Sequence, residues 1–186
     1  MRLPLLTLSA LLLATPAAAD PYDDFLELCV APAGDVAAAQ GKARAAGFAD
    51  APAEVAQTFR LPDFPDAVAL MRGEGAAMEI FVAGTAPRPD FGAMTGTTCI
   101  VVAPGLDARS AEARLETKLG FPAFTDGAAD APMWYLTGGP DAWRSEPQLV
   151  GADDAGIAAV ARARPVSIFA VLPVGQGAGL MYGTLK

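Results

Sequence analysis

The side chains that most often carry out enzymatic chemistry are scarce in this chain. Its 186 residues include no histidine, no asparagine and only two cysteines, Cys29 and Cys99. Without histidine the chain cannot build a Ser–His or Cys–His nucleophile pair, a histidine-containing zinc site or the attachment motif of c-type haem. The cysteines lie far apart in the sequence, whereas thiol redox motifs space them closely. We therefore expect no cofactor and no metal site.

Carboxylates remain available for acid–base chemistry, which needs no histidine. Three pairs of acids are close in the sequence: Asp23 with Asp24, Asp63 with Asp66, and Asp153 with Asp154. Each pair lies near an expected helix start, where acids cap the helix and complement its dipole. We interpret them as structural. Two acids that converge about 5 to 10 Å apart in a cleft would instead support a hydrolase.

A glycine-rich segment at 175–179 invites comparison with a phosphate-binding loop. Such loops connect a strand to a helix, whose first amides hold the anion. Here the apolar run that follows, 179–183, is typical of a second strand. The segment therefore predicts the turn of a β-hairpin.

Aromatic and arginine side chains gather in the last third of the chain, and both types are common in recognition surfaces. The candidate ligand or partner surface consists of Trp134, Tyr135, Trp143, Arg144, Arg162 and Arg164. On an acidic protein, such a basic and aromatic patch could hold a carboxylate-bearing ligand or an acidic partner. The alternative is that Trp134 belongs to the core and the arginines lie at the end of a helix.

Five segments have the composition of strands. The run 97–103 is rich in β-branched residues, ends at Ala103-Pro104-Gly105 and carries Cys99, so we expect it to be a central strand. The other four expected strands are 78–83, 132–137, 166–172 and 179–183.

Helices are indicated between these strands by caps and stop signals. Asp20 and Pro21 begin the first, in which Phe25, Leu28 and Cys29 share a core-facing side. Further helices are expected at 36–46 after Asp35, at 50–60, at 65–72, and between Asp107 and Gly120. For 153–164, helix and strand both stay open, because helix-favouring end charges compete with an internal glycine.

Residues 1–19 have the features of a cleaved secretory signal peptide. Arg2 is followed by an apolar stretch and by Ala17-Ala18-Ala19 just before Asp20. Proline interrupts the run, which is too short for a membrane span of about 20 residues. We therefore predict a periplasmic protein that is not attached to the membrane after cleavage. In that oxidising compartment Cys29 and Cys99 would form one disulfide, stabilising the fold by about 4 kcal/mol in the chain-entropy model.

The charge balance limits the partners. The chain has 13 basic and 21 acidic residues, and cleavage would remove only Arg2 among them. A protein this acidic is repelled by nucleic acid and by anionic membranes. We expect neither as a partner.

These observations predict a single α+β domain over 20–186, with an antiparallel sheet of about five strands and helices packed mainly on one face. The function they favour is a non-enzymatic binding or accessory module of the cell envelope, whose partner is an envelope protein or a small acidic ligand. The alternatives are a carboxylate-dependent hydrolase and an inhibitor of an envelope enzyme. An inhibitor would expose an apolar patch of more than about 300 Å².

Expression of the full chain in a bacterium should give a periplasmic protein whose first residue is Asp20. Intact-mass measurement of the periplasmic fraction tests this. Ala19→Pro, which alters the residue before the cleavage point, should leave the longer precursor in the membrane fraction. Recovery of the full-length wild-type chain from the cytoplasm would contradict export.

Overall fold

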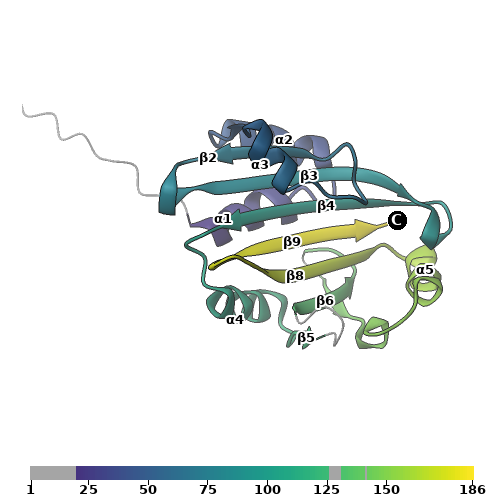
Figure 1. Cartoon of the computed structure of the whole chain (residues 1–186). Helices are drawn as coiled ribbons and strands as arrows, with labels where there is room; N and C mark the ends of the chain where they lie inside the picture. The colour runs from purple at the N-terminus through teal and green to yellow at the C-terminus, as the bar shows by residue number, and fades with distance from the viewer. Residues whose placement is uncertain (1–19, 126–130, 141) are drawn as a thin grey trace, which may run out of the picture.

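The computed structural model describes residues 20–125, 131–140 and 142–186 (Figure 1). The predicted signal peptide, residues 1–19, lies outside the described residues. Within these three ranges, no helix combines the length and the apolar character that crossing a membrane requires.

Within these described ranges, the chain folds around one nine-stranded sheet in which neighbouring strands are antiparallel (Figure 1). The strands lie in the order β1–β2–β3–β4–β9–β8–β6–β5, and β7 also pairs with β6. Their bounds are β1 Ala49–Asp50, β2 Val68–Arg72, β3 Glu79–Arg88, β4 Met94–Ala103, β5 Phe124–Thr125, β6 Pro132–Thr137, β7 Arg144–Ser145, β8 Val166–Val174 and β9 Gly177–Leu185.

The α+β class is confirmed, but the predicted sheet of about five strands is wrong. The five expected strands are present as β3, β4, β6, β8 and β9, and four others join them. Of these four, β1, β5 and β7 have two residues each, which is too short for an alternating pattern to be recognised.

The fourth additional strand, β2, replaces the helix predicted over 65–72. Alanine, leucine and methionine in this segment favour a helix in isolation. Instead, five consecutive residues of β2 pair with β3, from Val68 opposite Ala83 to Arg72 opposite Glu79. Leu70 is fully buried in this arrangement. Tertiary pairing therefore overrides the local preference.

The described residues form five α-helices beside the sheet: α1 Pro21–Phe25, α2 Val36–Ala45, α3 Ala53–Thr58, α4 Ala108–Leu119 and α5 Asp154–Ala163. Helix α1 continues into a π-helical turn, η1 (Leu26–Val30), and short 3₁₀ turns lie at Gly75–Ala77 (η2), Pro89–Phe91 (η3) and Pro147–Leu149 (η4). Four helices begin with an aspartate whose side chain accepts a hydrogen bond from a first-turn amide. These caps are Asp20, Asp35, Asp107 and Asp153. The segment left open between helix and strand is helix α5.

The sequence predicted helices mainly on one face; of the five α-helices in the described residues, three pack on one face and two on the other. Helices α1, α2 and α4 pack with η1 on the face that carries Phe81, Cys99 and Phe169; we call this the disulfide face. The other face, which we call the open face, is covered by α3 at one end and α5 at the other (Figure 1). The largest core lies under the disulfide face, where Phe25 and Phe169 meet edge to face at 6.3 Å between ring centroids.

Cys29 of η1 and Cys99 of β4 form a disulfide, as the sequence predicted, with 5.4 Å between their Cα atoms. Both side chains are buried. Strand β4 is hydrogen-bonded on one side to β3 and on the other to β9, so it lies in the middle of the sheet. The disulfide therefore attaches the N-terminal helical segment to the centre of the fold.

Replacement of both cysteines by alanine should lower the free energy of unfolding by about 2–4 kcal/mol, because the unfolded chain regains the freedom of a long loop. Urea unfolding of the purified, oxidised protein measures this. Wild type with a reductant should unfold at the midpoint of the variant, and the variant should not respond to the reductant. A wild-type midpoint that reductant leaves unchanged would contradict a stabilising disulfide.

Candidate functional site

A cavity of about 450 Å³ lies on the open face, between the segment that precedes β2 and helix α5. Its floor is formed by parts of β4, β8 and β9. Phe64, Arg88 and Phe91 border it, and so do Asp154 and Ile157 of α5. The cavity thus combines an apolar surface with a few charged groups, a composition typical of small-ligand sites.

Arg88, the last residue of β3, is the most distinctive side chain of this cavity. Its guanidinium carbon lies 5.0 Å from the ring centroid of Phe91 and 5.9 Å from that of Phe64. The Arg88 side chain is 22% exposed, and its ion-pair partner is Asp63, at 3.7 Å and 70% exposed. An arginine held by two rings and by one distant, solvated carboxylate keeps donors available for a further acceptor.

Glycines in the strands beneath the cavity leave space above the sheet. Gly96 of β4 lies beneath Arg88, since a Cβ atom there would be 2.8 Å from the Cγ of Arg88. Gly183 of β9, opposite Thr98 in the register, also lines the cavity. Gly84 lets the backbone before β2 approach the sheet, because a Cβ atom there would be 2.9 Å from the Cα of Ala67. Small residues on neighbouring strands thus leave room for an occupant.

The structure separates most of the six residues of the predicted recognition surface. Trp134 and Tyr135 are consecutive in β6, so they point to opposite faces of the sheet. Trp134 is fully buried under the disulfide face, where its indole donates a hydrogen bond to the carbonyl of Phe121 at 3.0 Å. Trp143 packs edge to face on Phe169, 5.6 Å away. Of the six, only Tyr135 lines the cavity.

Of the three predicted arginines, Arg144 and Arg164 come together around a smaller hollow of about 290 Å³. Arg164 is already paired with the buried carboxylate of Glu146, 2.7 Å away. Burial raises the pKa of Glu146, but hydrogen bonds from Thr137 and Gln148 and the charge of Arg164 together hold that pKa below its usual value. Arg162 lies elsewhere, in the last turn of α5. The hollow at Arg144 is thus built around an internal ion pair.

Two of the three acid pairs lie at helix starts, as expected, whereas Asp63 of the third pair lies before strand β2 and pairs with Arg88. Asp153 caps α5, and its neighbour Asp154 lies in the first turn of that helix. Asp23 contacts Arg114 at 3.0 Å. The described residues contain no group of three histidine, cysteine, aspartate or glutamate side chains placed to hold a metal ion.

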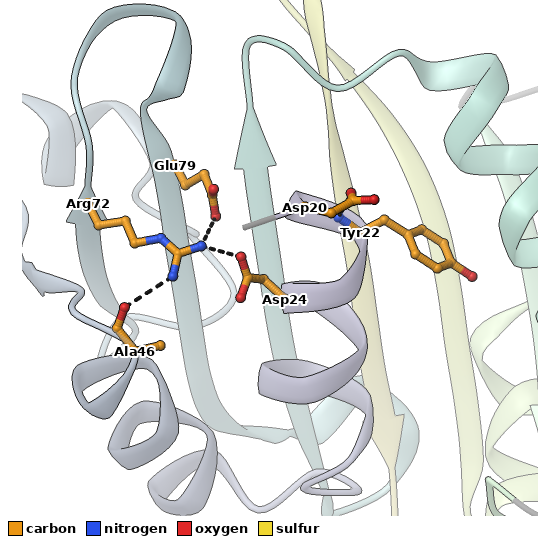
Figure 2. Close-up of polar contacts among 6 residues, drawn as sticks. All are labelled: Asp20, Tyr22, Asp24, Ala46, Arg72 and Glu79. Atoms are coloured by element: carbon orange, nitrogen blue, oxygen red, sulfur yellow. Dashed lines mark hydrogen bonds and ion pairs between the residues drawn. The ribbon is translucent and has the colours of Figure 1, made fainter. Parts of the chain in front are cut away.

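Two carboxylates do converge at a place that the sequence did not indicate. Asp24 of α1 and Glu79 of β3 both contact Nη2 of Arg72 in β2, the latter at 2.9 Å (Figure 2). We call these three residues the Arg72 cluster. The guanidinium also donates to the carbonyl of Ala46 at 3.1 Å and lies 4.5 Å above the ring of Phe48. Arg72 and Glu79 are opposite one another in the β2–β3 register, so recognising β2 as a strand would have paired them.

Burial sets the protonation of this cluster. Burial has the largest effect and raises the pKa of Glu79. The charge of Arg72 lowers this pKa, and the neighbouring carboxylate of Asp24 raises it. The resulting pKa of Glu79 is about 7. Arg72 contacts one oxygen of each carboxylate, Oδ2 of Asp24 and Oε2 of Glu79. This shared ion pair joins α1 to β2 and β3, which is a structural role.

Comparison of the chain with protein-family models, curated proteins and solved structures gives no match. The site is therefore interpreted from its own geometry.

Gly96→Ala should displace the Arg88 side chain, because the new methyl group would lie within contact distance of the Arg88 Cγ. We expect the fold to be kept, with the free energy of unfolding lowered by about 1–3 kcal/mol. The ¹⁵N shift of the Arg88 Nε should move. Gly139→Ala is the matched control, since a Cβ atom there meets nothing within 4 Å. An unmoved Arg88 signal in Gly96→Ala would show that Arg88 does not lie over this part of the sheet.

Proposed function

We propose that the protein is an exported, non-enzymatic binding module of the cell envelope that holds a small organic monoanion in the cavity on the open face. The volume supports this, since ligand pockets usually measure about 300–1,000 Å³. The observation that carries the proposal is Arg88, whose guanidinium is pre-positioned by Phe64 and Phe91 at the cavity wall.

The contacts of Arg88 favour an anionic group on the ligand. A guanidinium binds a carboxylate through two parallel hydrogen bonds, and holding it in place beforehand reduces the entropy lost on binding. The present partner, Asp63, is 3.7 Å away and largely exposed, so the interaction between them is weak. A ligand carboxylate could therefore replace Asp63 at little cost.

The remaining lining defines the body and the charge of the ligand. Ile157, Ile168 and Met181 offer apolar surface above the sheet. Asp63 and Asp154 also border the cavity, and their negative charges oppose a ligand with several anionic groups. The lining therefore favours a compact apolar molecule with one carboxylate.

The two alternative functions have less support. Asp24, one of the two converging carboxylates, belongs to α1 on the disulfide face, whereas the cavity is on the open face. An enzyme inhibitor would present its apolar groups outward to a protein surface, but here Phe64 and Phe91 border a concave site. A small ligand suits a concave site better than a protein partner does.

Three probes with the same body test the proposal: phenylacetate, phenylacetamide and 2-phenylethylammonium. Titration monitored by the amide shifts of Gly96 and Gly183 should show phenylacetate binding most tightly. Arg88→Met should weaken phenylacetate binding roughly tenfold to a hundredfold, which is the affinity that a charge-assisted hydrogen bond contributes. The affinity for phenylacetamide should stay nearly unchanged.

Arg109→Met is the matched control, because Arg109 lies on α4, which packs on the disulfide face. It should bind all three probes as wild type does. Equal affinity for the anion and the amide, or binding of phenylacetate that Arg88→Met does not weaken, would contradict the proposal.

A further inference from the structure

The Arg72 cluster has an unbalanced charge in a largely desolvated place. Two carboxylates share one guanidinium, and the exposed fractions of the side chains are 13% for Asp24, 19% for Arg72 and 8% for Glu79. If both acids are ionised, one negative charge has no counter-ion. A buried charge of this kind is costly, and binding one proton removes it.

We propose that the Arg72 cluster is a one-proton latch, which fastens helix α1 to strands β2 and β3 more firmly in mildly acidic than in mildly alkaline surroundings. The latch connects elements that are distant in the sequence, since Asp24 belongs to α1 while Arg72 and Glu79 belong to the β2–β3 pair (Figure 2).

The charges on the surrounding elements do not balance the cluster. On α1, Asp20 and Asp23 pair instead with Arg114 of α4, at 2.6 and 3.0 Å. At the end of α2, Arg44 pairs with Asp50 at 2.7 Å. The contact of this end with the cluster is the Ala46 carbonyl, which accepts a hydrogen bond from Arg72 and brings no positive charge.

In the described part of the chain, the elements on the other side of Glu79 bring no cation either. Glu74, in the turn between β2 and β3, is exposed. The hollow of about 350 Å³ beside Glu79 is lined otherwise by uncharged residues, including Pro21 and Gly105. A proton is therefore the cation that this cluster lacks.

The geometry indicates which carboxyl group binds the proton. Asp24 lies in the first turn of α1, nearer to solvent. Glu79 lies on a strand and is the more deeply buried of the two. The pKa of Glu79, about 7 in the folded protein against 4.5 ordinarily, agrees with this assignment.

The sign of the pH effect follows from linkage. Between about pH 4.5 and pH 7 the folded state holds the Glu79 proton and the unfolded state has released it. The stability that proton binding by Glu79 contributes is fully present below pH 4.5 and is lost as the pH rises through the pKa of Glu79 in the folded protein. Above that pH, Glu79 is ionised beside Asp24, and the repulsion acts on the start of α1. The adjacent hollow, which both Pro21 and Glu79 line, leaves space for that end of the helix to move.

Thermal unfolding at several pH values tests the latch. From pH 6 to pH 8 the melting temperature of wild type should fall by about 5 °C more than that of Glu79→Gln, whose neutral amide keeps an acceptor for Arg72. Glu74→Gln, which removes an exposed acid from the turn between β2 and β3, should behave as wild type. Asp20 and Glu146 have lowered pKa values and titrate below this range in every variant.

Carbon-13 NMR of the wild-type protein provides a test that does not depend on the variants folding. The Glu79 carboxyl carbon should titrate with a midpoint near the pKa of about 7, and the backbone amide of Asp24 should shift with the same midpoint. A Glu79 midpoint near the ordinary 4.5, or a pH dependence of melting that Glu79→Gln retains, would overturn the proposal.

Discussion

The covalent attachment of the N-terminal segment to the central strand is the constraint on which the other features depend. The Cys29–Cys99 disulfide fixes η1 against β4, and α1 continues directly into η1. Asp20 and Asp23 can then reach Arg114 of α4, and Asp24 can reach Arg72 of β2. One attached helix thus brings acidic groups to basic groups on both sides of the disulfide face. The burial of Phe25 against Phe169 adds apolar contact at the same place.

The open face has the opposite organisation. Helices α3 and α5 cover its two ends, and the strands between them carry residues with little or no side chain, such as Gly96 and Gly183. Arg88 crosses this low floor and lies beside two aromatic rings. The molecule therefore has one face on which helices are held by a disulfide and ion pairs, and a second face on which Arg88 borders a cavity.

Local sequence patterns predicted the long elements well. The cap and stop signals around α4, Asp107 and Gly120, stand where the sequence indicated, and the hairpin of β8 and β9 was recognisable from its turn. The cysteines could be paired because only two are present. Strand β2 was missed because its residues also suit a helix, and only pairing with β3 decides between the two structures. The two-residue strands carry no pattern at all.

The site was harder to predict than the fold, because its residues meet only through tertiary structure. Arg88 is separated in the sequence from α5, which also lines the cavity, and neither position is distinctive in isolation. The predicted surface grouped Trp134 with Tyr135 by proximity in the sequence, but the alternation of a strand places them on opposite faces. Asp24 was expected only to support the start of a helix. Its contact with Arg72 could be predicted only by knowing where strand β2 lies in the sheet.

Hydrogen–deuterium exchange of the oxidised and reduced protein tests most directly whether the disulfide positions the N-terminal helix. Under native conditions, reduction should speed amide exchange in the peptide covering residues 20–30 by at least about tenfold, while the β8–β9 hairpin stays protected. Exchange in residues 20–30 that reduction leaves unchanged would contradict the central role of this bond. Equal loss of protection in that peptide and in the hairpin would contradict a local effect on α1.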